Sequence, residues 1–169
     1  LGSGTQLALS ISFLIMKFNN IKINTHQLAH LLKRGLRSGV GIESFNQGGF
    51  NIDVGKSKNS KEIPVNILNI KWPKNWKITL ITDDNLIGIH GKNEIKEFKK
   101  LDKINNIQTA NNCKSLLMNI IPGLIEENFD EFSNGIRNIQ DNMSKIFYGK
   151  EDRFASKSVE KIFKTLRKK

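Results

Sequence analysis

The sequence predicts an α+β fold, because apolar residues at helical spacing occur together with short segments of alternating apolar and polar residues. The helical pattern dominates beyond residue 111, and the alternation is clearest over residues 50–54. With 38% hydrophobic and 25% charged residues among 169, the composition is typical of a globular chain. It excludes a disordered, collagen-like or disulfide-stapled protein.

The first helix follows a glycine-rich loop at the start of the chain. A strongly apolar stretch follows residues 1–6 and continues to about Phe18. Ser3 and Gln6 have the spacing of a capping box, in which the serine caps the helix and the glutamine returns to its backbone. The sequence therefore predicts a loop that opens directly into a helix capped by Ser3.

A second helix and two strands follow in the first half of the chain. Asn24 as N-cap with Gln27 three residues later indicates a helix that ends near Gly35. Alternation predicts strands over residues 50–54 and 76–82, with Asn51 on the polar face of the first.

The second half reads as mainly helical. Residues 93–101 form an amphipathic pattern, and a long helical region begins near residue 111. Pro122 is expected to kink or divide that region, and a basic helix is expected to begin near Ala155. The composition changes near residue 75, which indicates two parts, 1–75 and 76–169.

The formal charge of +11 does not by itself predict a nucleic-acid-binding protein. Only 5 of the 27 basic residues are arginine, the side chain that reads bases and phosphates bidentately. The single cysteine, Cys113, cannot form an internal disulfide, which fits a reducing cytoplasm. The longest apolar run, near residues 7–18, is too short to span a bilayer, so no membrane partner is expected.

The glycine-rich loop is a candidate phosphate site. A glycine loop at a helix start presents free amides and the positive end of the helix dipole to an anion. Gly2 and Gly4 permit close approach, and Ser3 and Thr5 add hydroxyl donors. The alternative is an ordinary glycine turn before a buried helix.

A second candidate lies at residues 34–39. Arg34 and Arg37 stand beside glycines, and guanidinium groups bind phosphate or carboxylate bidentately. Ser38 and Gly39 continue the motif toward the next element. The alternative is a pair of solvated arginines at a tight turn.

Four further residues have chemistry worth weighing. His90, between two nearby glycines, suits an acid/base or substrate contact, or a solvent-facing turn. His26 and His30 have metal-binding spacing, but no third ligand is evident, which favours ordinary helix positions. Asp53 is a candidate ligand for a magnesium ion carried by a diphosphate.

Together the two glycine motifs resemble those of a known protein family. Leu1–Gln6 and residues 34–49 resemble the beta-ribofuranosylaminobenzene 5'-phosphate synthase family of the GHMP kinase superfamily. The resemblance extends more loosely through residues 72–76, 88–94 and 117–124. It implies a two-subdomain fold, with a ribosomal protein S5 domain 2-like half at 1–75 and a ferredoxin-like half at 76–169. The family continues both upstream and downstream of these motifs, so we expect this chain, truncated at both ends, to be an internal part of a longer protein.

One position departs from the kinases of that superfamily. Their second motif reads Ser-Gly-Val-Asp, and the aspartate is the catalytic carboxylate in several members; here Gly41 takes its place. Glu43 is two residues away, about 200° around a helix axis. The departure favours the synthase over a small-molecule kinase.

The resemblance implies a pentosyltransferase. Its substrates are 5-phosphoribosyl 1-diphosphate and 4-aminobenzoate or 4-hydroxybenzoate, and it releases CO2 and diphosphate in tetrahydromethanopterin biosynthesis. On this hypothesis residues 2–5 hold the diphosphate with Mg²⁺, while Arg34 and Arg37 bind phosphate or the benzoate carboxylate. Ser38 and Gly39 belong to the same phosphate site and shape its turn. An ATP-dependent kinase and a basic nucleic-acid binder are the alternatives, and the sequence leaves a homodimer open.

Overall fold

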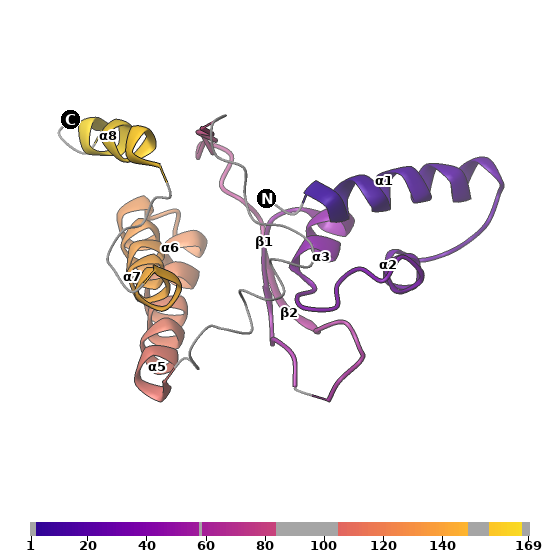
Figure 1. The fold of residues 1–169 in the computed structure, drawn as a ribbon, viewed down its shortest axis with the longest axis horizontal. Helices are drawn as coiled ribbons and strands as arrows, with labels where there is room; N and C mark the ends of the chain where they lie inside the picture. The colour runs from indigo at the N-terminus through magenta and orange to yellow at the C-terminus, as the bar shows by residue number, and fades with distance from the viewer. Residues whose placement is uncertain (1–2, 58, 84–104, 149–155, 167–169) are drawn as a thin grey trace. The chain divides into compact units, whose positions relative to one another are not determined.

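In a computed structural model of the chain, the described residues are 3–57, 59–83, 105–148 and 156–166 (Figure 1). The chain divides into two compact units, Leu1–Pro73 and Lys74–Lys169. Helices and a small antiparallel sheet make it an α+β protein, as the sequence predicts.

The first unit combines three helices with a two-stranded sheet. The strands β1 and β2 pair antiparallel, with a register shift between Ile52 and Asp53. The predicted second helix forms but ends at Leu31, before the arginine motif begins. The strand β2 was not anticipated from the alternation. The elements are α1 (Ser3–Phe18), α2 (Thr25–Leu31), α3 (Val40–Gln47), β1 (Phe50–Asp53) and β2 (Asn66–Ile70).

The helix starts confirm one predicted cap and correct the other. At α2, the Gln27 amide donates to Asn24 Oδ1 at 2.8 Å, and Gln27 Oε1 accepts from the Asn24 amide at 3.2 Å. The helix α1 begins at Ser3 itself, so this serine lies within the first turn and is not the N-cap. The Gln6 side-chain amide donates to the Gly41 carbonyl at 2.6 Å, so it makes a tertiary contact.

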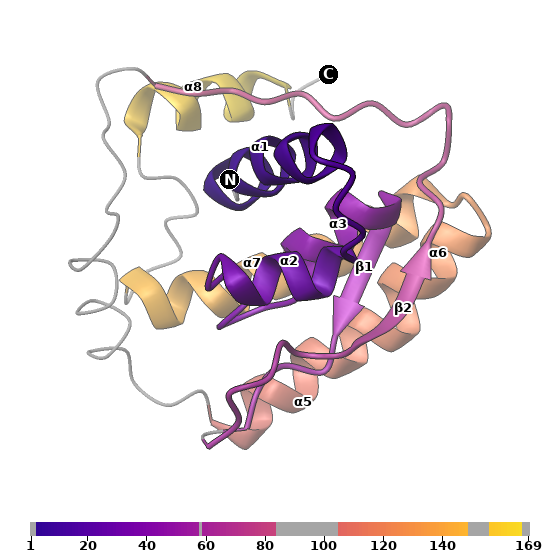
Figure 2. The same ribbon diagram turned by 90° about the vertical axis from the view of Figure 1, so that its right-hand side faces the viewer.

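The core of the first unit lies where its helices meet. Each helix contacts the other two, and α3 also contacts β1 (Figure 2). Half-buried apolar side chains, Met16 and Phe45 among them, surround this centre. The fully buried residues are Leu9, Leu28, Ala29 and Ile42.

The polar face predicted for β1 is wrong at Asn51, which is buried, whereas Val54 just beyond the strand is 61% exposed. The Asn51 amide donates to the Gly48 carbonyl at 2.9 Å, and its Oδ1 accepts from the side chains of Asn69 at 2.8 Å and Asn66 at 3.2 Å. Burial of an amide is tolerated when its donors and acceptors are paired. Asn51 therefore links the glycine turn before β1 to β2.

The second unit is built from helices, as predicted for the region beyond residue 111. The first begins earlier than predicted, because Asn105 and Gln108 form a capping box that the sequence analysis did not identify. The elements are α5 (Asn106–Ser115), a π-helical turn η1 (Leu116–Ile120), α6 (Ile121–Ile125), α7 (Phe129–Tyr148) and α8 (Lys157–Leu166).

Pro122 does not divide the helical region, which is continuous over residues 106–125 and breaks at residues 126–128, where Glu127 has a left-handed φ of 54°. Pro122 has no amide proton, and in a regular α-helix its ring would clash with the carbonyl four residues earlier. That residue, Met118, lies in the π-helical turn η1, where the regular α-helical pattern is interrupted.

Two glycines, Gly123 in α6 and Gly135 in α7, allow α6 and η1 to pack closely against α7. A Cβ on Gly123 would lie 2.5 Å from the Phe132 nitrogen, and one on Gly135 would lie 2.6 Å from Ile120 Cγ1.

The strand predicted over residues 76–82 is wrong: this segment has no regular secondary structure. Among the described residues it has no partner strand, and Ile78 and Leu80 are 70% and 69% exposed. Trp76 packs instead on Phe129 and Phe132, with ring centroids 5.2 and 5.1 Å away. Alternation predicts which side chains share a face, but pairing requires a neighbouring strand.

The predicted basic helix near Ala155 is confirmed as α8. Its first turn is capped by Ser156, whose Oγ accepts from the Val159 amide at 3.3 Å. The helix predicted over residues 93–101 lies outside the described residues. Among the helices that are described, none is long and apolar enough to cross a membrane.

Candidate functional site

The second glycine motif forms the start of α3, where an aspartate from β1 meets it. Asp53 Oδ2 accepts from the Ser38 hydroxyl at 2.6 Å and from the Gly39 amide at 2.8 Å. The Ser38 Oγ in turn accepts from the Val40 amide at 3.3 Å. The amide and hydroxyl that the sequence assigns to phosphate are thus bound to a carboxylate of the same chain.

The same carboxylate holds a second turn. Asp53 Oδ1 accepts from the Gly55 amide at 2.9 Å. Desolvation by burial acts to raise the pKa of Asp53, but the hydrogen bonds from the Ser38 hydroxyl and nearby backbone amides act to lower it. The net result is a pKa below the ordinary 3.8. Asp53 is therefore an ionised group that joins the Ser38–Gly39 turn to the turn after β1.

The metal role predicted for Asp53 stays a prediction, and the structure shows what else this carboxylate binds. A carboxylate offers about four lone-pair positions, and hydrogen bonds occupy three of these. Within the described ranges, no group of three or more His, Cys, Asp or Glu residues is placed to hold a metal ion. The three hydrogen bonds of Asp53 are with groups of the Ser38–Gly39 turn and with the Gly55 amide.

The first glycine motif lies against the start of α3. Gln6 binds the Gly41 carbonyl, and a Cβ on Gly41 would lie 3.6 Å from Thr5 Cγ2. Ser3 and Gly4 are exposed at the first turn of α1. A Cβ on Gly4 would have no heavy atom within 4 Å, so nothing in the described structure requires glycine there.

The structure therefore brings together the two motifs that the sequence assigned to phosphate. Thr5 of the first motif lies beside Gly41, two residues beyond Gly39 of the second. Two of the predicted site residues cannot be located in this way, because Gly2 and His90 lie outside the described residues.

The two arginines of the second motif are exposed on a fixed turn. Arg34 and Arg37 flank Gly35, whose φ of 76° is left-handed. A Cβ on Gly35 would meet Ile42 Cδ1 at 2.4 Å, so packing against α3 holds the turn. The Lys56 ammonium donates to the Leu36 carbonyl at 2.9 Å, between the two arginines in sequence.

Lys56 was missed by the sequence analysis. It is 20 residues from Leu36 in a polar loop with other lysines, and spacing alone gave no reason to select it. In the fold, the turn after Asp53 leads to Lys56, whose ammonium reaches the Leu36 carbonyl between the two arginines.

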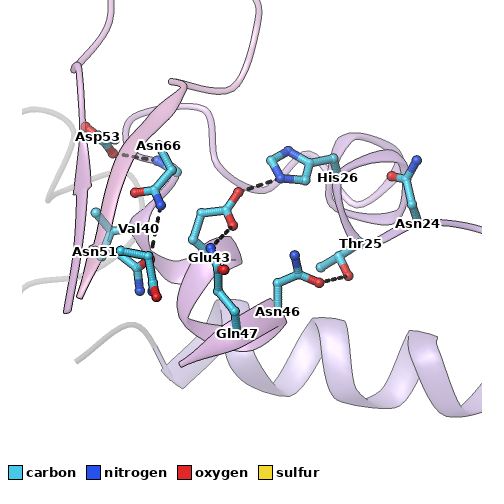
Figure 3. A network of polar contacts seen from close by, with 12 residues as sticks. Asn24, Thr25, His26, Val40, Glu43, Asn46, Gln47, Asn51, Asp53 and Asn66 are labelled. Atoms are coloured by element: carbon cyan, nitrogen blue, oxygen red, sulfur yellow. Dashed lines mark hydrogen bonds and ion pairs between the residues drawn. The ribbon is translucent and has the colours of Figure 1, made fainter. Parts of the chain in front are cut away.

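Glu43, considered above as a substitute for the missing carboxylate, is engaged elsewhere. It is 6% exposed, and its Oε1 lies 2.6 Å from His26 Nε2 on α2, while its Oε2 accepts from Gln47 at 3.1 Å. Figure 3 shows His26 and Gln47 converging on this carboxylate. The contact joins α2 to α3, with a second link from Thr25 to Asn46 at 3.1 Å. His26 thus has a carboxylate partner, in place of the metal considered for it with His30.

Comparison with known proteins finds three similar archaeal proteins that share one name. The chain is 32% identical over 154 residues to the beta-ribofuranosylphenol 5'-phosphate synthase of Methanocaldococcus jannaschii, covering 83% of this chain and 46% of that protein. Proteins of the same name match at 28% over 151 residues in Methanothermobacter thermautotrophicus and at 29% over 152 residues in Archaeoglobus fulgidus. These two matches again cover 83% of this chain, and they cover 46% and 48% of those proteins.

These matches confirm the resemblance drawn from the two glycine motifs: the chain is related to the beta-ribofuranosylphenol 5'-phosphate synthases. It spans about half the length of the curated relatives it matches. No family model matches the chain.

Proposed function

We propose that the protein containing this chain is a pentosyltransferase that joins a phosphorylated ribose to an aromatic acid. The relatives' names describe a product with a ribofuranosyl ring, a phenol and a 5'-phosphate. The donor that supplies such a ribosyl group in activated form is 5-phosphoribosyl 1-diphosphate. A phenol product favours 4-hydroxybenzoate as the acceptor over 4-aminobenzoate.

The proposed reaction breaks one bond in each substrate and forms one bond between the two substrates. The bond between ribose C1 and the diphosphate oxygen breaks, and a bond forms from C1 to the ring carbon that carries the carboxylate. The carboxylate then leaves as CO2, and its bonding electrons return to the ring. The phosphate at C5 is unchanged, so the product is a ribofuranosylphenol 5'-phosphate. In this proposal the reaction is a step of tetrahydromethanopterin biosynthesis.

The observation that carries the proposal is the meeting of the two glycine motifs. The exposed first turn of α1 and the arginine turn both reach the start of α3 through Gln6, Thr5 and Gly39. A diphosphate leaving group must be neutralised, and helix amides and guanidinium groups serve that purpose. In this proposal Ser3, Gly4 and Thr5 hold phosphate directly, together with Arg34 and Arg37. Ser38 and Gly39 act by shaping the turn through Asp53.

Magnesium enters this proposal with the substrate. Mg²⁺ is commonly bound by one or two carboxylates together with substrate phosphates, and it would supply charge neutralisation to the leaving diphosphate. Because three hydrogen bonds engage Asp53, we assign no residue of the described chain as its ligand.

The main alternative is an ATP-dependent small-molecule kinase. Such an enzyme requires a carboxylate near the start of α3, where Gly41 faces Thr5, and Glu43 is bound to His26 and Gln47. These contacts favour the synthase. A nucleic-acid binder, the third alternative, requires affinity that falls steeply with salt.

The test uses the full-length protein with 5-phosphoribosyl 1-diphosphate, Mg²⁺ and either benzoate. We expect diphosphate and CO2 to be released in equal amounts, faster with 4-hydroxybenzoate. The Methanocaldococcus jannaschii relative serves as the comparison enzyme. Absence of turnover with both acids, combined with ATP consumption on an alcohol, would establish the kinase instead.

A further inference from the structure

The arginine turn, residues 34–38, has a third cation beside it that the sequence did not indicate. The Lys56 ammonium binds the Leu36 carbonyl at 2.9 Å. The Leu36 carbonyl belongs to the peptide bond that joins Leu36 to Arg37, so the ammonium lies against the backbone between the two arginines. Lys56 and both arginines are exposed.

The position of Lys56 is fixed by the backbone that precedes it. Gly55 has a left-handed φ of 69°, and its amide is bound by Asp53 Oδ1 at 2.9 Å. The other oxygen of Asp53 binds Ser38 and Gly39. One carboxylate therefore holds both the end of the arginine turn and the residue before Lys56, which brings the two together.

The donors of Lys56 are only partly used. An ammonium group carries three N–H donors, and the Leu36 carbonyl accepts from one of them. Asp53, the carboxylate nearest along the chain, is engaged by its own three hydrogen bonds. The arginine turn therefore carries two exposed arginines and, on the Leu36 carbonyl between them, the ammonium of Lys56. Guanidinium and ammonium groups are the side-chain cations that bind phosphate oxygens.

We propose that Lys56 is a phosphate-binding residue that acts together with Arg34 and Arg37. The ligand is a phosphate group of the sugar substrate, either the 5-phosphate or the diphosphate at C1. The identity of this sugar rests on the proposed function, whereas phosphate binding by the three cations does not. Lys56 is the member of the set that only the fold supplies.

The test measures phosphate binding directly, without turnover. Inorganic diphosphate and ribose 5-phosphate are titrated by calorimetry into the full-length protein at fixed salt. For Lys56→Gln we expect about 10-fold weaker binding of one probe, because a charge-assisted hydrogen bond is lost. The probe that is affected identifies which end of the sugar substrate the three cations hold.

The matched control is Lys61→Gln, which removes the same charge from an exposed position in the same loop. It should bind both probes as the unmodified protein does, and Lys56→Arg should restore most of the affinity. Thermal unfolding of each variant establishes that it is folded. Equal affinities for Lys56→Gln and Lys61→Gln, or no binding of either probe by the unmodified protein, would overturn the proposal.

These outcomes separate the two proposals. Phosphate binding that depends on Lys56, without release of CO2 from either benzoate, retains the phosphate site and rejects the transferase. Turnover that Lys56→Gln leaves unchanged in both kcat and donor KM retains the transferase and rejects the role of Lys56.

Discussion

The starts of α1 and α3 are both glycine-rich, yet they differ in what their glycines do. At α3, a Cβ on Gly39 would lie 2.5 Å from the Pro64 carbonyl oxygen, and its amide is bound by Asp53. At α1, a Cβ on Gly4 would meet no heavy atom of the described residues within 4 Å. Packing therefore requires the glycine of α3, whereas no packing contact in the described part of the chain requires that of α1.

The difference shows why a glycine motif at a helix start is ambiguous evidence for phosphate. An anion is present at the start of α3, but it belongs to Asp53 of the same chain. The helix dipole and free amides favour either a ligand or a side-chain carboxylate in that position. Only the tertiary contacts distinguish the two cases.

The largest expected effect is at Gly39. Gly39→Ala should lower the free energy of unfolding by about 2 to 3 kcal/mol, because the new methyl group overlaps a backbone oxygen that cannot rotate away. The matched variant is Gly41→Ala, whose Cβ would make an ordinary 3.6 Å contact with Thr5. It should be neutral or slightly stabilising in urea unfolding. Equal losses for both variants would contradict the packing role of Gly39.

A smaller effect is expected at Asp53. Asp53→Asn should cost about 1 to 2 kcal/mol, because the amide keeps one acceptor but presents an NH2 group to donors. Hydrogen exchange should accelerate at the amides of Gly39 and Gly55. Glu62→Gln, at an exposed position, is the control.

The pH dependence of the free energy of unfolding provides a second test of the Asp53 contacts. Since the pKa of Asp53 is lower in the folded state, its ionised form contributes stability above its ordinary pKa. That contribution is lost as the pH falls through the lower folded value. The stability difference between the unmodified protein and Asp53→Asn should therefore shrink below about pH 4. A difference that stays constant down to pH 2 would argue against the ionised contact.

The smallest effect on stability is expected at Gly4. Gly4→Ala should leave stability unchanged or raise it by up to about 1 kcal/mol, because alanine favours a helix and the site has room. Diphosphate binding should weaken nonetheless, since a methyl group would obstruct close approach to the first turn of α1. Unchanged calorimetric affinity in a fully folded variant would remove Gly4 from the phosphate site.

The sequence by itself determined the local elements. The Asn24 capping box and the start of α8 depend on residues a few positions apart, and both were predicted. The pairing of the two glycine motifs with a known family was also evident from sequence, and the relatives confirm it. Short-range hydrogen bonds and backbone preferences are sufficient for such features.

The tertiary structure decided which groups meet. Gln6 binds Gly41 across 35 residues, and Lys56 binds Leu36 across 20. Asn51 is buried against the expected alternation because three backbone and side-chain partners satisfy its amide. Residues 76–82 form no strand, since alternation cannot supply a neighbour to pair with. These outcomes depend on contacts between distant segments, and a pattern read along one segment does not contain them.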